Sequence, residues 1–156
     1  MHKLTWLLTL TCVLLFLKPG TVQATNTPIL RLNTEMHTAM INRIDVDAAE
    51  RYLVTGSDDK TVRVWSLPEG RLLRVLRPPI SAGDEGKIYA VAISPDGETV
   101  AAGGWDQDDS IYLFNRATGQ LRHRLTGHSN VILHLAYSPD GRYLVASLGG
   151  QNGIRV

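Results

Sequence analysis

A motif that recurs about every 45 residues places this chain among the repeat architectures. Three segments align in phase, at residues 41–65, 88–114 and 132–156. An isoleucine opens all three segments, and the second and third share Ser-Pro-Asp-Gly outright. A repeat of this size is one supersecondary unit, which buries its apolar face only against neighbouring units. The chain is therefore expected to fold as a row of similar units.

Each repeat predicts four short β-strands. Residues 88–93 form a mostly apolar run that suits a strand covered on both faces, and residues 61–65 alternate with the period of a β-sheet. Residues 72–76 predict the fourth strand of the first repeat. Beyond residue 24, no window of the sequence carries the apolar stripe and caps of an amphipathic helix. The chain is thus expected to be all-β, with one four-stranded sheet per repeat.

Tight turns are expected between the first and second strands of the repeats. A proline fixes φ, an aspartate side chain can bond its own backbone, and a glycine takes the positive φ that such a turn needs. The turn residues are Ser94, Pro95, Asp96 and Gly97 in the second repeat and Ser138, Pro139, Asp140 and Gly141 in the third.

These residues resemble the WD-repeat family. The family pattern has Gly-His before the first strand, Ser-Pro-Asp-Gly after it and Trp-Asp at the close of the third strand. Gly127-His128 matches the first element, and Trp65 stands at the Trp position of the first repeat. The second repeat departs from the pattern, because Phe114-Asn115 replaces Trp-Asp and Asp84 stands at the Gly-His position. Met36-His37 stands there in the first repeat.

The resemblance implies a partial β-propeller of four-stranded antiparallel blades. About two and a half blades are expected from the alignment, with repeats at about 37–83, 84–127 and 128–156, the last of them incomplete. Residues 28–32 resemble the strand that closes the ring in this family. Because Val156 falls inside an expected strand, we expect a truncated fragment of an exported bacterial-type protein, with further blades in the full chain.

The resemblance also implies a buried, hydrogen-bonded set of side chains within a blade. Buried polar groups need partners, and a satisfied set stiffens a sheet, so a structural role is expected for them rather than a catalytic one. By position, the set is His37, Ser57, Asp59 and Trp65 in the first blade, Asp108 in the second and His128 in the third.

The first 24 residues predict a secretory signal peptide. Lys3 gives a basic start, and the uncharged run at residues 4–17 would measure about 21 Å as a helix, short of the roughly 30 Å of a bilayer core. Lys18-Pro19-Gly20 breaks the run, and Val22-Gln23-Ala24 offers the small residues that signal peptidase reads. We expect cleavage after Ala24, a secreted or periplasmic protein and no stable membrane span. An uncleaved anchor is the alternative.

No catalytic, metal or cofactor site is expected. Cys12, the only cysteine, lies in the predicted signal peptide. Without Lys3 and Lys18 the chain keeps 14 basic residues against 15 acidic ones, which does not predict nucleic-acid binding. The acidic loop at residues 105–110 lacks the ligand order and glycine of a calcium loop, which favours a solvated loop. The insert at residues 78–87 is a candidate contact surface, but a tolerated loop insertion is the favoured interpretation.

The first hypothesis is a non-catalytic scaffold outside the cytoplasm that binds a protein or peptide. The fold alone does not name the partner. The alternative is a regulatory or substrate-recruiting propeller of a larger exported enzyme, such as a caspase-like peptidase, whose catalytic domain lies beyond Val156. A catalytic propeller with a cofactor in its central channel is disfavoured, because the expected innermost strands carry no cluster of ligating side chains.

Overall fold

The computed structural model describes residues 35–80, 82–151 and 153–156. The predicted signal peptide at residues 1–24, with its Cys12, and the predicted ring-closing strand at residues 28–32 lie outside the described residues. Among the described residues there is no helix that is long and apolar enough to cross a membrane.

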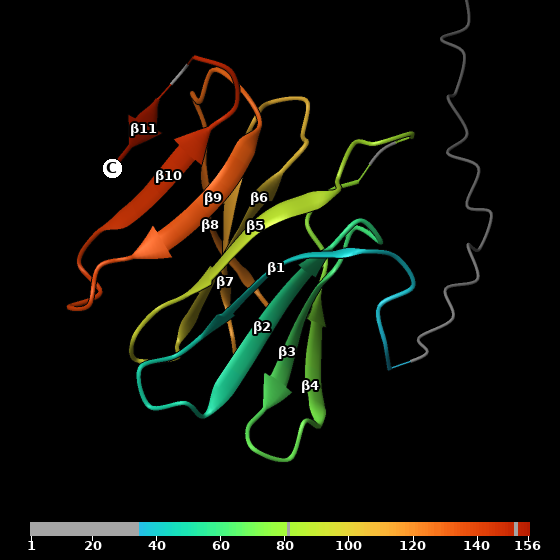
Figure 1. The fold of residues 1–156 in the computed structure, drawn as a ribbon, viewed down its shortest axis with the longest axis vertical. Coiled ribbons are helices and arrows are strands. Elements are labelled where there is room, and N and C mark those ends of the chain that lie inside the picture. Colours follow the sequence, from blue (N-terminus) through green and yellow to red (C-terminus); the bar gives the residue numbers. More distant parts are fainter. Residues whose placement is uncertain (1–34, 81, 152) are drawn as a thin grey trace, which may run out of the picture. The chain divides into compact units, whose positions relative to one another are not determined.

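The described residues form three antiparallel sheets and no helix (Figure 1). Neighbours in sequence are neighbours in each sheet, so each sheet is one blade of four strands, or three in the last case. This confirms the all-β partial propeller. The strands are β1 (Ile41–Val46), β2 (Tyr52–Ser57), β3 (Val62–Ser66) and β4 (Leu72–Leu76) in the first blade, β5 (Ile88–Ile93), β6 (Thr99–Gly104), β7 (Ile111–Asn115) and β8 (Leu121–Leu125) in the second, and β9 (Ile132–Tyr137), β10 (Leu144–Leu148) and β11 (Ile154–Arg155) in the third.

The repeats agree in detail as well as in strand number. The register between the first and second strands shifts between Ile41 and Arg43 in the first blade, and at the equivalent place, between Ile88 and Ala90, in the second. The third and fourth strands show a second matching shift, next to Trp65 and Phe114. Equivalent residues therefore hold equivalent places, and positions can be compared between blades.

Apolar side chains bury the blades against one another. The cluster between the first two blades includes Val54, Val62 and Val64 on one side and Val91 and Phe114 on the other. Full burial of one Val, Leu or Phe side chain contributes about 1.5–3 kcal/mol, so each interface is a substantial source of stability. The cluster between the second and third blades consists of Ala90, Ala92, Ala101, Ile111, Ile132, Leu135, Ala146 and Leu148, with Leu113, Tyr137 and Leu144 packed against it.

Glycines mark the closest approach of the blades. A Cβ atom at Gly56 would lie 2.7 Å from the side chains of Ile88 and Val91, and one at the equivalent Gly103 would lie 2.9 Å from Cβ of Ile132. Real side chains do not tolerate such contacts without movement. The two glycines therefore allow β2 and β6 to press against the following blade.

Candidate functional site

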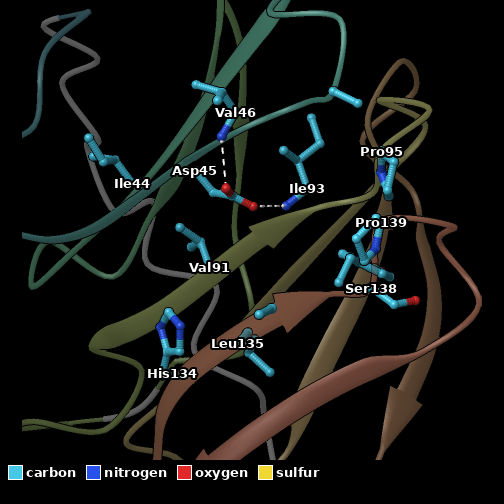
Figure 2. Close-up of a pocket in the computed structure, with 13 residues that line it drawn as sticks. Ile44, Asp45, Val46, Val91, Ile93, Pro95, His134, Leu135, Ser138 and Pro139 are labelled. Atoms are coloured by element: carbon cyan, nitrogen blue, oxygen red, sulfur yellow. Dashed lines mark hydrogen bonds between the residues drawn. The ribbon is translucent and has the colours of Figure 1, made fainter.

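A pocket of about 350 Å³ opens along the innermost strands β1, β5 and β9 (Figure 2). Its wall is mainly apolar, with Ile44 and Val46 from β1, Val91 from β5 and Leu135 from β9. Ile44 is 60% exposed, so this wall offers open apolar surface rather than a filled core. Contact with another molecule would remove that surface from water, which favours binding.

Asp45 is the acidic group of this pocket. One carboxylate oxygen accepts a hydrogen bond from the backbone N–H of Val46 at 2.9 Å, and the other accepts one from the N–H of Ile93 at 2.8 Å (Figure 2). The carboxylate thus joins β1 to β5 across the blade boundary. Ala92 and Ala136 hold the equivalent positions of the other two blades, so this link is particular to the first boundary.

His134 is another polar side chain of the pocket and lies exposed on β9. Within the part of the chain that the structure describes, its ring makes no hydrogen bond and no three His, Cys, Asp or Glu side chains gather as a metal site. With Asp45 engaged by backbone N–H groups, the pocket presents the His134 ring against a mainly apolar wall. This arrangement suits recognition of a surface better than proton transfer, which needs a positioned acid and base.

The first blade contains a connected polar network. His37 Nδ1 lies 2.8 Å from Asp59 Oδ2, and His37 Nε2 lies 2.6 Å from Thr55 Oγ1. The indole N–H of Trp65 donates to the same Thr55 oxygen at 3.0 Å. A hydroxyl donates once and accepts as well, so Thr55 can donate to Nε2 while it accepts from the indole. Nδ1 of His37 then carries the proton that Asp59 accepts.

Thr55, rather than Ser57, therefore links the histidine to the tryptophan. Ser57 lies at one end of the network, where its hydroxyl donates to the carbonyl of Ala39 at 3.2 Å and accepts the N–H of Asp59 at 3.1 Å. The sequence did not identify Thr55, because the family pattern assigns the hydroxyl of the set to Ser57. The strand period was the available signal, since Thr55 and Ser57 lie on one face of β2.

Asp59 is the most heavily bonded group of the network. Its Oδ1 accepts the hydroxyl of Thr61 at 2.6 Å and the N–H of Thr61 at 3.0 Å, and its Oδ2 accepts the N–H of Thr38 at 3.1 Å in addition to His37. Burial alone would raise the pKa of Asp59, but the bonds from Thr61, His37 and Thr38 outweigh it and lower that pKa below its ordinary value. The carboxylate stays ionised and holds the segment before β1 on the blade.

The second blade uses a different set of polar contacts. Asp108 is exposed and pairs with Arg124 of β8. Asp106 accepts the phenolic hydroxyl of Tyr112 at 2.8 Å and lies 3.7 Å from Arg124. Burial and the bond to Asp106 raise the pKa of Tyr112 to about 12. Two carboxylates of the loop that was expected to be solvated are thus engaged with the sheet beside it.

The third blade retains His128 without the partners of the first. Among the described residues, its buried Nδ1 has no hydrogen-bond partner. By repeat position, Ala146 stands where the first blade has Thr55, and Gln151 stands where it has Asp59. Neither side chain supplies the hydroxyl or the carboxylate that engages His37. The histidine alone therefore does not specify a network.

The expected turn residues form two matching turns. Ser94 and Asp96 hydrogen bond to each other, and Ser138 and Asp140 do the same. The serine hydroxyls also accept the N–H groups of Thr99 and Tyr143. Gly97 and Gly141 have φ of 73° and 71°, as the turn requires. Pro95 and Pro139 line the end of the pocket in Figure 2.

A polar cluster that sequence reasoning missed connects the first two blades at these turns. Asp47 is 1% exposed, and it accepts the backbone N–H groups of Arg51 and Tyr52 and the Nε of Arg51. Arg51 then donates to the carbonyl of Asp96 at 2.7 Å. The guanidinium of Arg116 lies 3.8 Å from the ring centroid of Tyr52, within reach of a cation–π contact. Asp47, Arg51 and Tyr52 meet within one turn of the first blade, and the stacking of the blades brings Asp96 and Arg116 to them.

Known proteins share the three repeats. The family model described as WD domain, G-beta repeat, matches residues 28–66, 70–115 and 119–156. Coronin-7 of Mus musculus is 33% identical over 129 residues, which cover 81% of this chain and 13% of that protein. The small ribosomal subunit protein RACK1y of Oryza sativa subsp. japonica is 32% identical over 116 residues, which cover 72% of this chain and 32% of that protein.

A further relative, WD repeat-containing protein 62 of Mus musculus, is 27% identical over 68% of this chain and 7% of its own length. The chain thus spans less than a third of the length of these relatives. The family matches cover most of the chain. The first match includes β1 to β3, and the second and third each begin with the last strand of the preceding blade, β4 and β8, and continue through the first three strands of the next blade. The chain therefore belongs to the WD-repeat family.

Proposed function

We propose that this chain is a non-catalytic scaffold that binds a protein or peptide on the innermost strands of its propeller. The observation that carries the proposal is the pocket along β1, β5 and β9, where apolar side chains stand open to solvent beside His134. An apolar surface with a few polar groups is suited to a polypeptide partner. The WD repeats support a protein-binding role in general.

Photocrosslinking from the pocket tests this proposal. A photoreactive phenylalanine analogue at His134 is expected to capture partner proteins, and Ile44→Asp in the same chain is expected to lower the yield of each adduct at least about tenfold, because it places a charge on the apolar wall. Leu121→Asp is the matched control, since Leu121 is 48% exposed on the outermost strand β8. Equal yields from the two variants, measured by mass spectrometry, contradict the proposal.

The proposed scaffold works outside the cytoplasm. Support comes from the N-terminal pattern, in which a basic start, an uncharged run and small residues before the expected cleavage point follow one another. Residues 1–24 fused to an alkaline phosphatase that folds only after export should yield active reporter in bacterial cells. Leu10→Arg within the uncharged run should abolish that activity. Activity that survives this substitution would contradict export by the segment.

A further inference from the structure

A second pocket, of about 360 Å³, lies at the boundary between the second and third blades. The loop between β6 and β7 supplies Trp105, Gln107 and Asp109 to its wall. The connection between β8 and β9 supplies Ser129 and Asn130 from the other side. The pocket is separate from the one along the innermost strands, and neither the polar network of the first blade nor the turn residues contribute to it.

Trp105 is held open at the wall of this pocket. Its side chain is 53% exposed, yet its backbone N–H donates to the carbonyl of Lys87 at 3.1 Å and its carbonyl accepts the N–H of Gly86 at 2.6 Å. A Cβ at the preceding Gly104 would lie 2.0 Å from the same Lys87 oxygen, so the backbone can approach this closely only at a glycine. The backbone of Trp105 is therefore anchored to Gly86 and Lys87, and its side chain remains about half exposed at the wall of the pocket.

Asp109 is the third carboxylate of the loop and, unlike Asp106 and Asp108, does not face Arg124 in an ion pair. Asp106 and Asp108 both face Arg124, and Asp106 also accepts the hydroxyl of Tyr112. In the described part of the chain, the carboxylate of Asp109 accepts no hydrogen bond and joins no ion pair, although it is partly buried. Partial burial and the neighbouring Asp106 and Asp108 raise its pKa, while the nearby His128 opposes that rise. A cation beside Asp109 would remove this electrostatic cost.

We propose that this pocket binds an arginine side chain of a protein partner, with the guanidinium stacked on the indole of Trp105 and paired with the carboxylate of Asp109. A planar guanidinium can use an aromatic face and a carboxylate together, which an ammonium group does less well. Gln107 and Ser129 provide polar groups at the wall for its remaining N–H donors. The inference rests on the proposed scaffold function, because it names one chemical feature of the partner.

Titration with a defined peptide tests the pocket. The probe is the tripeptide N-acetyl-Gly-Arg-Gly-amide, and the readout is the NMR shift of the Trp105 indole N–H and of the backbone N–H groups of residues 129–131. A saturable shift is expected. Asp109→Asn should weaken the dissociation constant at least about fivefold, and it keeps the side-chain size and a residue type that tolerates the φ of 46° observed there. Trp105→Leu should weaken it to a similar degree.

Matched controls separate local recognition from general charge. Glu69→Gln removes the same charge from an exposed turn of the first blade and should leave the dissociation constant unchanged. The inference is overturned if N-acetyl-Gly-Gln-Gly-amide produces the same shifts with the same affinity. Equal weakening by Asp109→Asn and Glu69→Gln, or no saturable shift at all, also overturns it.

Failure of the arginine-pocket proposal can be distinguished from failure of the scaffold proposal. If the arginine tripeptide fails to bind while Ile44→Asp selectively abolishes crosslinking from His134, the pocket at Trp105 is rejected and the scaffold stands. If the tripeptide binds through Asp109 while Ile44→Asp and Leu121→Asp crosslink equally, the innermost-strand proposal is rejected instead.

Discussion

Thr55 shows how much can depend on one hydroxyl in a blade. It is 4% exposed and lies between two nitrogen atoms, Nε2 of His37 and Nε1 of Trp65. A buried donor or acceptor that loses its partner carries the full cost of desolvation, which is about 1–3 kcal/mol. The segment before β1 is attached to the blade largely through His37 and Asp59, so this hydroxyl also supports that attachment.

Replacement of this hydroxyl should be costly. We expect Thr55→Val to lower the free energy of unfolding by about 1–3 kcal/mol, because valine keeps the shape and leaves the indole N–H and the imidazole nitrogen unsatisfied. Thr38→Val is the control, since Thr38 is exposed and bonds through its backbone N–H. The measurement is urea denaturation followed by circular dichroism. Equal midpoints for the two variants would contradict the role of Thr55.

At the scale of the element, the second strand of each blade carries one equivalent position that has different surroundings in the three blades. Gly56 of β2, Gly103 of β6 and Ser147 of β10 are equivalent in register. The two glycines face isoleucines of the next blade, whereas Ser147 is opposite no blade among the described residues. The two glycines therefore mark the positions where the described blades press together.

This comparison predicts a position-dependent effect of one methyl group. Gly56→Ala should lower the free energy of unfolding by about 1–3 kcal/mol, because its Cβ would overlap the side chains of Ile88 and Val91. Ser147→Ala introduces no such overlap and should change stability by less than about 0.5 kcal/mol. Thermal and urea unfolding of the two variants provide the test. A neutral Gly56→Ala would show that the blades have room to separate.

At the scale of the whole molecule, burial of equivalent residues differs between the blades. Val62 of β3 and Ile111 of β7 are 0% and 2% exposed, but Ile154 of β11, at the same register position, is 63% exposed. The first two are covered by a following blade, and in the described residues no blade follows the third. Exposed apolar surface on a sheet promotes association between molecules.

We expect this chain to self-associate as its concentration rises. Ile154→Asp should shift sedimentation velocity profiles toward the monomer, because it places a charge on the open face of the third blade. Leu121→Asp, on the outermost strand β8, should leave the profiles unchanged. A wild-type chain that sediments as a monomer at all concentrations, or equal effects of the two variants, would contradict the expectation.

Much of the architecture could be predicted from the sequence, because its determinants are local. Residues 72–76 were expected as a strand and form β4 with the same bounds, and the two Ser-Pro-Asp-Gly turns have the expected glycine conformation. Strand β6 extends to Gly104, since β5 pairs with both of its terminal glycines. Turn residues and the alternation of apolar and polar side chains in a strand act over a few residues. In a repeat protein, each of these signals occurs several times in the sequence.

The sequence by itself thus determined the repeat, the all-β class and the turns, whereas the tertiary structure decided which side chains meet. The residues around Thr55 do not show that His37, which precedes β1, bonds to Thr55 and not to Ser57. Likewise, the stacking of the second and third blades brings Trp105 and Asp109 into one pocket with Ser129 and Asn130. Such contacts depend on how sheets pack face to face, and their geometry depends on all the side chains between the blades at once.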